Sequence, residues 1–203
     1  MYHLVLGIQL VSIAALFVES WMVFKYWKNR VHSWLFLACI AMLVNNLGYF
    51  LELTSFTRAP YFTALKFSYL GRVWITYALL MFVVELTGKK IPRIVRVALA
   101  VLCAATYLVM ATTEKTGLYY REMAFVMNQG FPDLDRIDGP WHYVWNVVLG
   151  ASVIYGIYLL ISARRKETNP IARKRLLMVF FSILAQGLFL VIEMFRLLPV
   201  TRV

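Results

Sequence analysis

Six long apolar stretches divide the sequence, and polar or charged residues separate them. The stretches cover residues 4–24, 33–54, 61–85, 92–112, 141–162 and 176–198. An α-helix rises about 1.5 Å per residue, so about 20 apolar residues cross the ~30 Å hydrocarbon core of a bilayer. The pattern therefore predicts an all-α fold, a polytopic bundle of six transmembrane helices that forms one domain over residues 1–203.

The prolines support this division. Pro60, Pro92, Pro140, Pro170 and Pro199 lie at or next to the expected helix ends, and Pro132 lies in a loop. Proline inside a helix removes a backbone donor and kinks the helix, so the six helices are expected to be continuous. Many transporters build their binding sites from discontinuous helices, and the absence of such breaks disfavours transport.

The longest connection between the stretches, residues 113–140, is rich in aromatic residues. Its part from Gly117 to Phe131 is rich in residues that favour β-strands and contains turn residues between Asn128 and Gly130. These features predict a β-hairpin outside the membrane, which would cover one end of the bundle. A loop without regular structure is the alternative.

Basic residues concentrate in alternate connections, which sets the expected orientation. They are Lys25, Lys28, Arg30, Lys89, Lys90, Arg93, Arg96, Arg164, Arg165, Lys166, Arg173, Lys174 and Arg175. Cytoplasmic loops carry an excess of Lys and Arg. The sequence therefore predicts a multi-pass protein of the plasma (inner) membrane with its N-terminus on the extracellular or periplasmic side.

Composition agrees with a membrane protein and excludes several soluble classes. Hydrophobic residues make up 62% of the chain and charged residues 15%, against about half and about a quarter in soluble domains. The net charge of +11 belongs mainly to the basic loops, so nucleic acid is not an expected partner. Cys39 and Cys103 lie inside apolar stretches and are expected to pack there without forming a disulfide.

Several polar residues fall where lipid is expected. A charged side chain at the centre of a bilayer costs about 2.5–3.5 kcal/mol or more, so each needs a partner or a function. The candidate ligand-binding residues are Asn45, Glu52, Arg72, Asn146, Gln186 and Glu193, all in the middle or outer half of the bundle. Pairing of Arg72 with Glu52 or Glu193 would neutralise the most costly charge. We expect a polar cavity open to the outside; the alternative is a set of interhelical hydrogen bonds that only fix helix packing.

Catalytic and metal-binding patterns are missing from the sequence. His3, His32 and His142 are far apart, and there is no H-E-x-x-H, C-x-x-C, G-x-S-x-G or phosphate-binding glycine loop. The chain is therefore not expected to be an enzyme or to hold a cofactor or metal. A sensory module with a small-molecule ligand is the leading hypothesis. A small transporter or channel-like protein is the alternative.

Several short segments resemble a known family. They are LGYFLELTS at 47–55, ALKFSYLG at 64–71, VVELTG at 83–88, residues 117–142 and NPIARKR at 169–175. They are similar to the seven-transmembrane sensor region at the amino end of bacterial histidine kinases and diguanylate cyclases. The resemblance implies a receptor in the lipid bilayer, a cytoplasmic signalling domain in the same or a partner chain, and a homodimer. Family members have a seventh helix and an output domain, so the chain is expected to be a fragment of a longer receptor. The alternative is a standalone remnant that signals through a partner.

Overall fold

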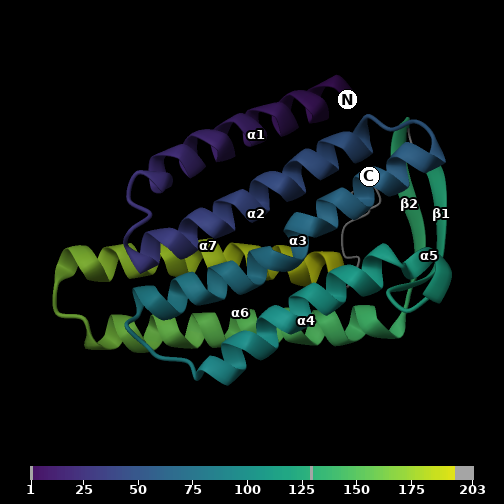
Figure 1. Cartoon of the computed structure of the whole chain (residues 1–203). Helices are drawn as coiled ribbons and strands as arrows, with labels where there is room; N and C mark the ends of the chain where they lie inside the picture. The colour runs from purple at the N-terminus through teal and green to yellow at the C-terminus, as the bar shows by residue number, and fades with distance from the viewer. Residues whose placement is uncertain (1, 129, 195–203) are drawn as a thin grey trace.

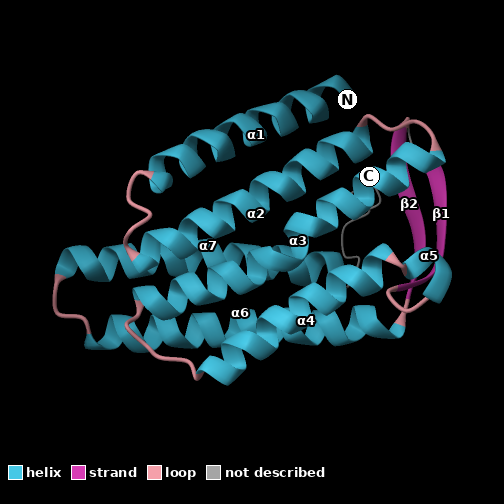
Figure 2. Ribbon diagram, in the orientation of Figure 1, coloured by secondary structure: helices cyan, strands magenta, loops and turns pink. Residues whose placement is uncertain are grey.

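The fold is a bundle of helices with a small β-hairpin at one end (Figures 1 and 2). The structure, a computed structural model, describes residues 2–128 and 130–194, apart from the side chains of Gln186 and residues 189–194. The elements are α1 (Tyr2–Phe24), α2 (Arg30–Leu53), α3 (Arg58–Leu86), α4 (Arg93–Ala111), α5 (Thr113–Thr116), β1 (Tyr120–Asn128), β2 (Phe131–Asp138), α6 (Pro140–Lys166) and α7 (Pro170–Met194). Of the described helices, α1, α2, α3, α4 and α6 are each long and apolar enough to cross a membrane. The predicted all-α membrane bundle with a hairpin is thus confirmed.

The largest difference from the expected boundaries is at the start of α7. This helix begins at Pro170, whereas the apolar stretch begins at Leu176. The Asn169 side chain explains the earlier start, because its Oδ1 accepts a hydrogen bond from the backbone N–H of Ile171 at 2.9 Å. An apolar stretch reports only the part of a helix at lipid depth, while the helix itself continues through basic residues to its cap.

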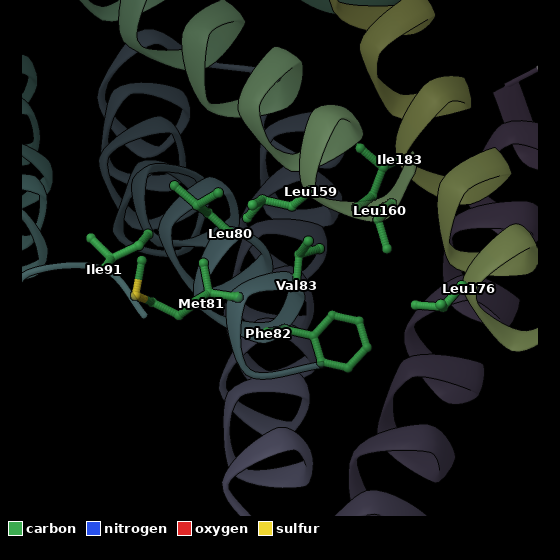
Figure 3. Packing of buried hydrophobic residues seen from close by; sticks show 10 residues of the cluster. Leu80, Met81, Phe82, Val83, Ile91, Leu159, Leu160, Leu176 and Ile183 are labelled. Atoms are coloured by element: carbon green, nitrogen blue, oxygen red, sulfur yellow. The ribbon is translucent and has the colours of Figure 1, made fainter. Parts of the chain in front are cut away.

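Helix α3 is the centre of the bundle. It packs against α2, α4 and α6, while α1 packs mainly against α2, and α7 against α6. Two apolar clusters form around α3. The cluster near the hairpin contains Tyr69, Val73 and Trp145, and the other is built from α3, α6 and α7. Figure 3 shows this second cluster, in which residues of α3 lie beside residues of α6 and α7.

Two glycines allow the backbones of α2 and α3 to come into direct contact. A Cβ atom added to Gly48 of α2 would lie 2.3 Å from the Cα of Ser68, and one added to Gly71 of α3 would lie 2.3 Å from the carbonyl oxygen of Ala41. Real carbon atoms in contact are about 3.5–4.0 Å apart. Each helix therefore presents a glycine to the other's backbone, and the pair is fixed at close range.

The hairpin lies at one end of the bundle, which we call the hairpin end (Figure 1). Strands β1 and β2 are antiparallel, with Tyr120 opposite Asp138 and Asn128 opposite Phe131. Thr113, the first residue of α5, holds the start of β1, since its hydroxyl donates to the Tyr120 carbonyl and accepts from the Tyr120 N–H. The opposite end carries the connections 25–29, 87–92 and 167–169 and the basic residues around them; we call it the basic end.

Candidate functional site

A cavity of about 440 Å³ lies between α3 and α6, with β2 at its mouth. Its described lining comes from α2, α3, β2, α6 and α7, together with Tyr119 next to β1. The lining residues used below are Asn45, Tyr69, Arg72, Thr76, Leu79, Val83, Tyr119, Arg136, Asp138, His142, Trp145, Asn146, Val153 and Ile183. Five separate segments of the chain therefore meet in one space.

Arg72 brings a positive charge from α3 to the lining. Its Nε donates a hydrogen bond to Oδ1 of Asn45 on α2, with a distance of 3.1 Å. The guanidinium carbon lies 4.6 Å from the centre of the Tyr69 ring, within the range of a cation–π interaction. The neighbours on α2 and α3 thus hold the guanidinium group in place beside the cavity.

The hairpin supplies a second arginine to the same cavity. Arg136 donates a hydrogen bond to the hydroxyl of Tyr120 at 3.0 Å, and that hydroxyl is also hydrogen-bonded to the hydroxyl of Tyr69. Asp138 Oδ1 lies 3.6 Å from Nε of Arg136 and 3.7 Å from Nδ1 of His142. This network joins the hairpin to α3 and α6 through polar contacts.

Burial disfavours ionisation of two tyrosines at the hairpin end, Tyr119 and Tyr120. Tyr120 is 1% exposed, and burial raises its pKa well above the ordinary value. Burial likewise raises the pKa of Tyr119, which is 2% exposed. A phenol is protonated at neutral pH in any case, and burial extends this to higher pH. Two arginines and one aspartate, Asp138, carry charge in the described lining, where His142 lies beside Asp138.

Polarity changes along the length of the cavity. Tyr69, Arg72 and Thr76 line its hairpin end from α3, whereas Leu79 and Val83 line its deeper part. Between Tyr69 and Val83 the helix rises about 21 Å, so the cavity is elongated along the bundle. A positively charged mouth and an apolar interior suit a molecule that has both a negative group and an apolar part.

Comparison with known proteins identifies the family. The family model described as the N-terminal 7TM region of histidine kinase matches residues 8–203. The chain belongs to this family. No curated protein and no solved structure matches the chain. The family places this protein among multi-pass membrane sensory modules, and it confirms the resemblance expected from the short segments of the sequence.

Of the six residues that the sequence singles out in this sensor region, Asn45, Arg72 and Asn146 line the cavity. Glu52 is buried at 6% exposure and accepts a hydrogen bond from the Ser68 hydroxyl. It is not among the described lining residues, although Arg72 and Arg136 both interact with it electrostatically. The side chains of Gln186 and Glu193 lie outside the described residues, so whether they reach the cavity stays a prediction.

The sequence did not indicate the hairpin residues of the sensor region's cavity. Arg136 and Asp138 lie two positions apart on β2 and therefore share a face of the strand. This spacing was the available signal in the sequence. Charged residues are common in exposed connections, however, so these two residues did not stand out from their neighbours as candidates for a site. For the described residues, no cluster of His, Cys, Asp and Glu could hold a metal ion.

Proposed function

We propose that this sensor region binds a small anionic molecule with an apolar part in the hairpin-end cavity and signals to a cytoplasmic kinase domain. The observation that carries the proposal is the presence of Arg72 and Arg136 in the polar, hairpin-end part of an elongated cavity whose deeper part is apolar. Two guanidinium groups favour a carboxylate or another anion, since charge-assisted hydrogen bonds are the strong ones. The apolar interior favours the rest of such a molecule.

The distribution of charge supports an external cavity. Thirteen of the 21 Lys and Arg residues lie in or next to the connections opposite the hairpin, and cytoplasmic segments carry the excess of Lys and Arg. The hairpin, the mouth of the cavity and the start of α1 then face the extracellular or periplasmic side. A receptor with this orientation can bind its ligand outside the cell and transmit the signal through helix packing.

Orientation can be tested with single cysteines. Glu122→Cys places a thiol on the exposed face of β1, and Lys174→Cys places one at the basic end. A membrane-impermeant maleimide added to intact cells should label the first variant and leave the second unlabelled until the cells are lysed. Cys39 and Cys103 are buried, so the background should be low. Labelling of Lys174→Cys in intact cells would reverse the proposed orientation.

Signalling requires that the ligand favour one packing of the helices over another. An anion at the mouth would contact α3 through Arg72, β2 through Arg136 and α6 through Asn146. Binding therefore stabilises the arrangement in which these three elements are close together. If the receptor forms a homodimer, as the family resemblance implies, such a shift in α3 and α6 would be passed on to both cytoplasmic domains.

The second apolar cluster supports a sensor over a transporter. Leu80, Val83 and Ile183 of this cluster line the deep end of the cavity, and Leu159 and Leu160 are buried beyond it, toward the basic end. A route from the cavity to the basic end would have to pass through this packed region. Protein interiors of this kind are close-packed, so a transported molecule would need a large rearrangement of α3 against α6.

Ligand binding can be tested with decanoate as the probe and decanol as its uncharged counterpart. The chain is reconstituted in nanodiscs of neutral lipid, and tryptophan fluorescence is followed, because Trp145 lines the cavity. We expect saturable binding of decanoate that is at least tenfold tighter than that of decanol. Arg72→Gln should abolish this difference, whereas Arg121→Gln, on the exposed part of β1, should retain it.

Two results would contradict the proposal. Equal effects of decanoate and decanol would show that the arginines do not select an anion. Equal loss in Arg72→Gln and Arg121→Gln would show that general surface charge, and not the cavity, attracts the probe. Circular dichroism of each variant confirms that the helices are retained.

A further inference from the structure

A second cavity, of about 300 Å³, lies at the basic end between α6 and α7. It is lined by Leu160, Ile161, Arg164, Arg165, Arg173, Leu177 and Phe180. On α6 the described lining of the first cavity ends at Gly156 and that of the second begins at Leu160, so the two are distinct cavities about one helical turn apart. Its lining combines three arginines with four apolar residues.

The three arginines have no counterion within the described part of the chain. No ion pair is formed there by Arg164, Arg165 or Arg173, and the buried Nε of Arg164 has no hydrogen-bond partner. The acid next to them in the sequence, Glu167, uses its Oε1 to accept the Asn169 N–H at 2.9 Å. A buried donor without an acceptor is costly, and three like charges around one space repel each other. An anion in the cavity would remove both costs.

The apolar lining lies on the membrane side of the arginines. Leu160 is one helical turn before Arg164 on α6, and Leu177 is one turn after Arg173 on α7. Residues four apart share a helix face, so each leucine continues the face of its arginine toward the middle of the bilayer. Phe180 extends this surface further along α7. The cavity thus offers charge at its outer edge and an apolar wall behind it.

We propose that this cavity binds the phosphate group of an anionic phospholipid, with the beginning of an acyl chain against Leu177 and Phe180. Arginine suits this role, because its planar guanidinium can donate two parallel hydrogen bonds to phosphate. Anionic lipids are present at the cytoplasmic surface, and basic pockets between transmembrane helices bind their headgroups. The lipid would link the end of α6 to the start of α7, where Arg164 and Arg173 lie on opposite sides of the connection 167–169.

Native mass spectrometry can measure this preference. The chain is purified from mixed micelles that contain equal amounts of phosphatidylglycerol and phosphatidylcholine, and the ratio of the retained lipids is recorded. We expect phosphatidylglycerol to dominate in the wild type. The double variant Arg164→Gln/Arg173→Gln should lower the ratio about tenfold, which corresponds to about 1.4 kcal/mol.

Lys89→Gln/Lys90→Gln is the matched control, since it removes two positive charges from exposed positions at the same end of the bundle. The control should keep the wild-type lipid ratio. Equal loss in both double variants, or no preference in the wild type, would overturn the proposal in favour of general surface attraction. Arg164→Lys/Arg173→Lys keeps the charge but not the paired hydrogen bonds, so it should also lose most of the preference, and full retention would count against a built phosphate site.

A further measurement distinguishes a lipid from free phosphate. The melting temperature is compared in phosphatidylcholine nanodiscs, in the same nanodiscs with inorganic phosphate, and in nanodiscs that contain phosphatidylglycerol. We expect stabilisation by phosphatidylglycerol alone, and equal stabilisation by inorganic phosphate would overturn the lipid as its source. Neither measurement depends on the hairpin-end cavity, so this proposal can fail or succeed independently of the proposed function.

Discussion

The backbone contact between α2 and α3 can be tested by adding one methyl group to either helix. In Gly48→Ala the new Cβ would lie 2.3 Å from Ser68 Cα, and in Gly71→Ala it would lie 2.3 Å from the Ala41 carbonyl oxygen and 2.5 Å from the Asn45 nitrogen. All of these neighbours are backbone atoms, so no side chain can rotate away. The helices would have to separate by more than about 1 Å to restore ordinary contact distances.

The cost can be worked out from its parts. Overpacking a close contact costs about 1–3 kcal/mol. Separation also weakens the hydrogen bond from Ser68 to Glu52, and each bond of this kind contributes about 1 kcal/mol. Alanine in place of glycine inside a helix returns about 1 kcal/mol through its higher helix propensity. The net expectation is a destabilisation of about 1–3 kcal/mol for each variant.

Gly150→Ala is the matched control for this experiment. Gly150 lies inside α6, and no atom would be within 4 Å of an added Cβ. The control should therefore gain up to about 1 kcal/mol from helix propensity alone. Unfolding by SDS titrated into mild detergent, followed by circular dichroism, measures all three variants. If Gly48→Ala and Gly71→Ala were as stable as Gly150→Ala, the close approach of α2 and α3 would be wrong.

Four further predictions concern the hairpin end. Tyr120→Phe should destabilise the fold by about 1–3 kcal/mol, because it removes hydrogen bonds to the buried Tyr69 and the partly buried Arg136. Tyr158→Phe, exposed on α6, should be neutral in the same thermal melts. Burial raises the pKa of Tyr120, so the contribution of this side chain to stability should be constant below pH ~10 and fall above it, where only the unfolded state ionises. Melting temperatures measured across this pH range should therefore decrease less at alkaline pH in Tyr120→Phe than in the wild type. Thr113→Val should cost about 1–3 kcal/mol by leaving the Tyr120 N–H unsatisfied, and an unchanged melting temperature would contradict the role of this hydroxyl. Lys66→Ala should cost less than about 1 kcal/mol, since Lys66 and Glu114 are both 35% exposed, and the effect should shrink as salt is added.

The parts of the fold that the sequence predicts well are those in which residue types contrast with their surroundings. Long apolar stretches give the helices, and the aromatic connection gives the hairpin. Asn45, Arg72 and Asn146 stand out as polar residues within apolar stretches, and all three line the hairpin-end cavity. They stand out because polar and charged groups at the depth of the bilayer are energetically costly and therefore need a partner or a function.

Other parts depend on packing that no local pattern encodes. Arg136 and Asp138 reach the cavity only because the hairpin folds back over the end of α3 with a particular register. Glu52 shares a helical stripe with Asn45, yet it turns to Ser68 because α2 and α3 touch at Gly48. A sequence pattern can place a residue on a face, but it does not say which neighbour that face meets.

One turn of α3 connects the cavity with the backbone contact between α2 and α3. Tyr69 and Arg72 line the cavity, while Ser68 and Gly71 of the same turn touch α2. Because Gly71 lies against the backbone of α2, α3 cannot move closer to α2. A ligand that drew Arg72 toward α6 would therefore either move α2 and α3 together or separate them at this contact. Interfaces packed at this density change between discrete arrangements and do not deform gradually. The contact at Gly71 would therefore make α2 part of the response to the proposed ligand, although α2 contributes only Asn45 to the described lining.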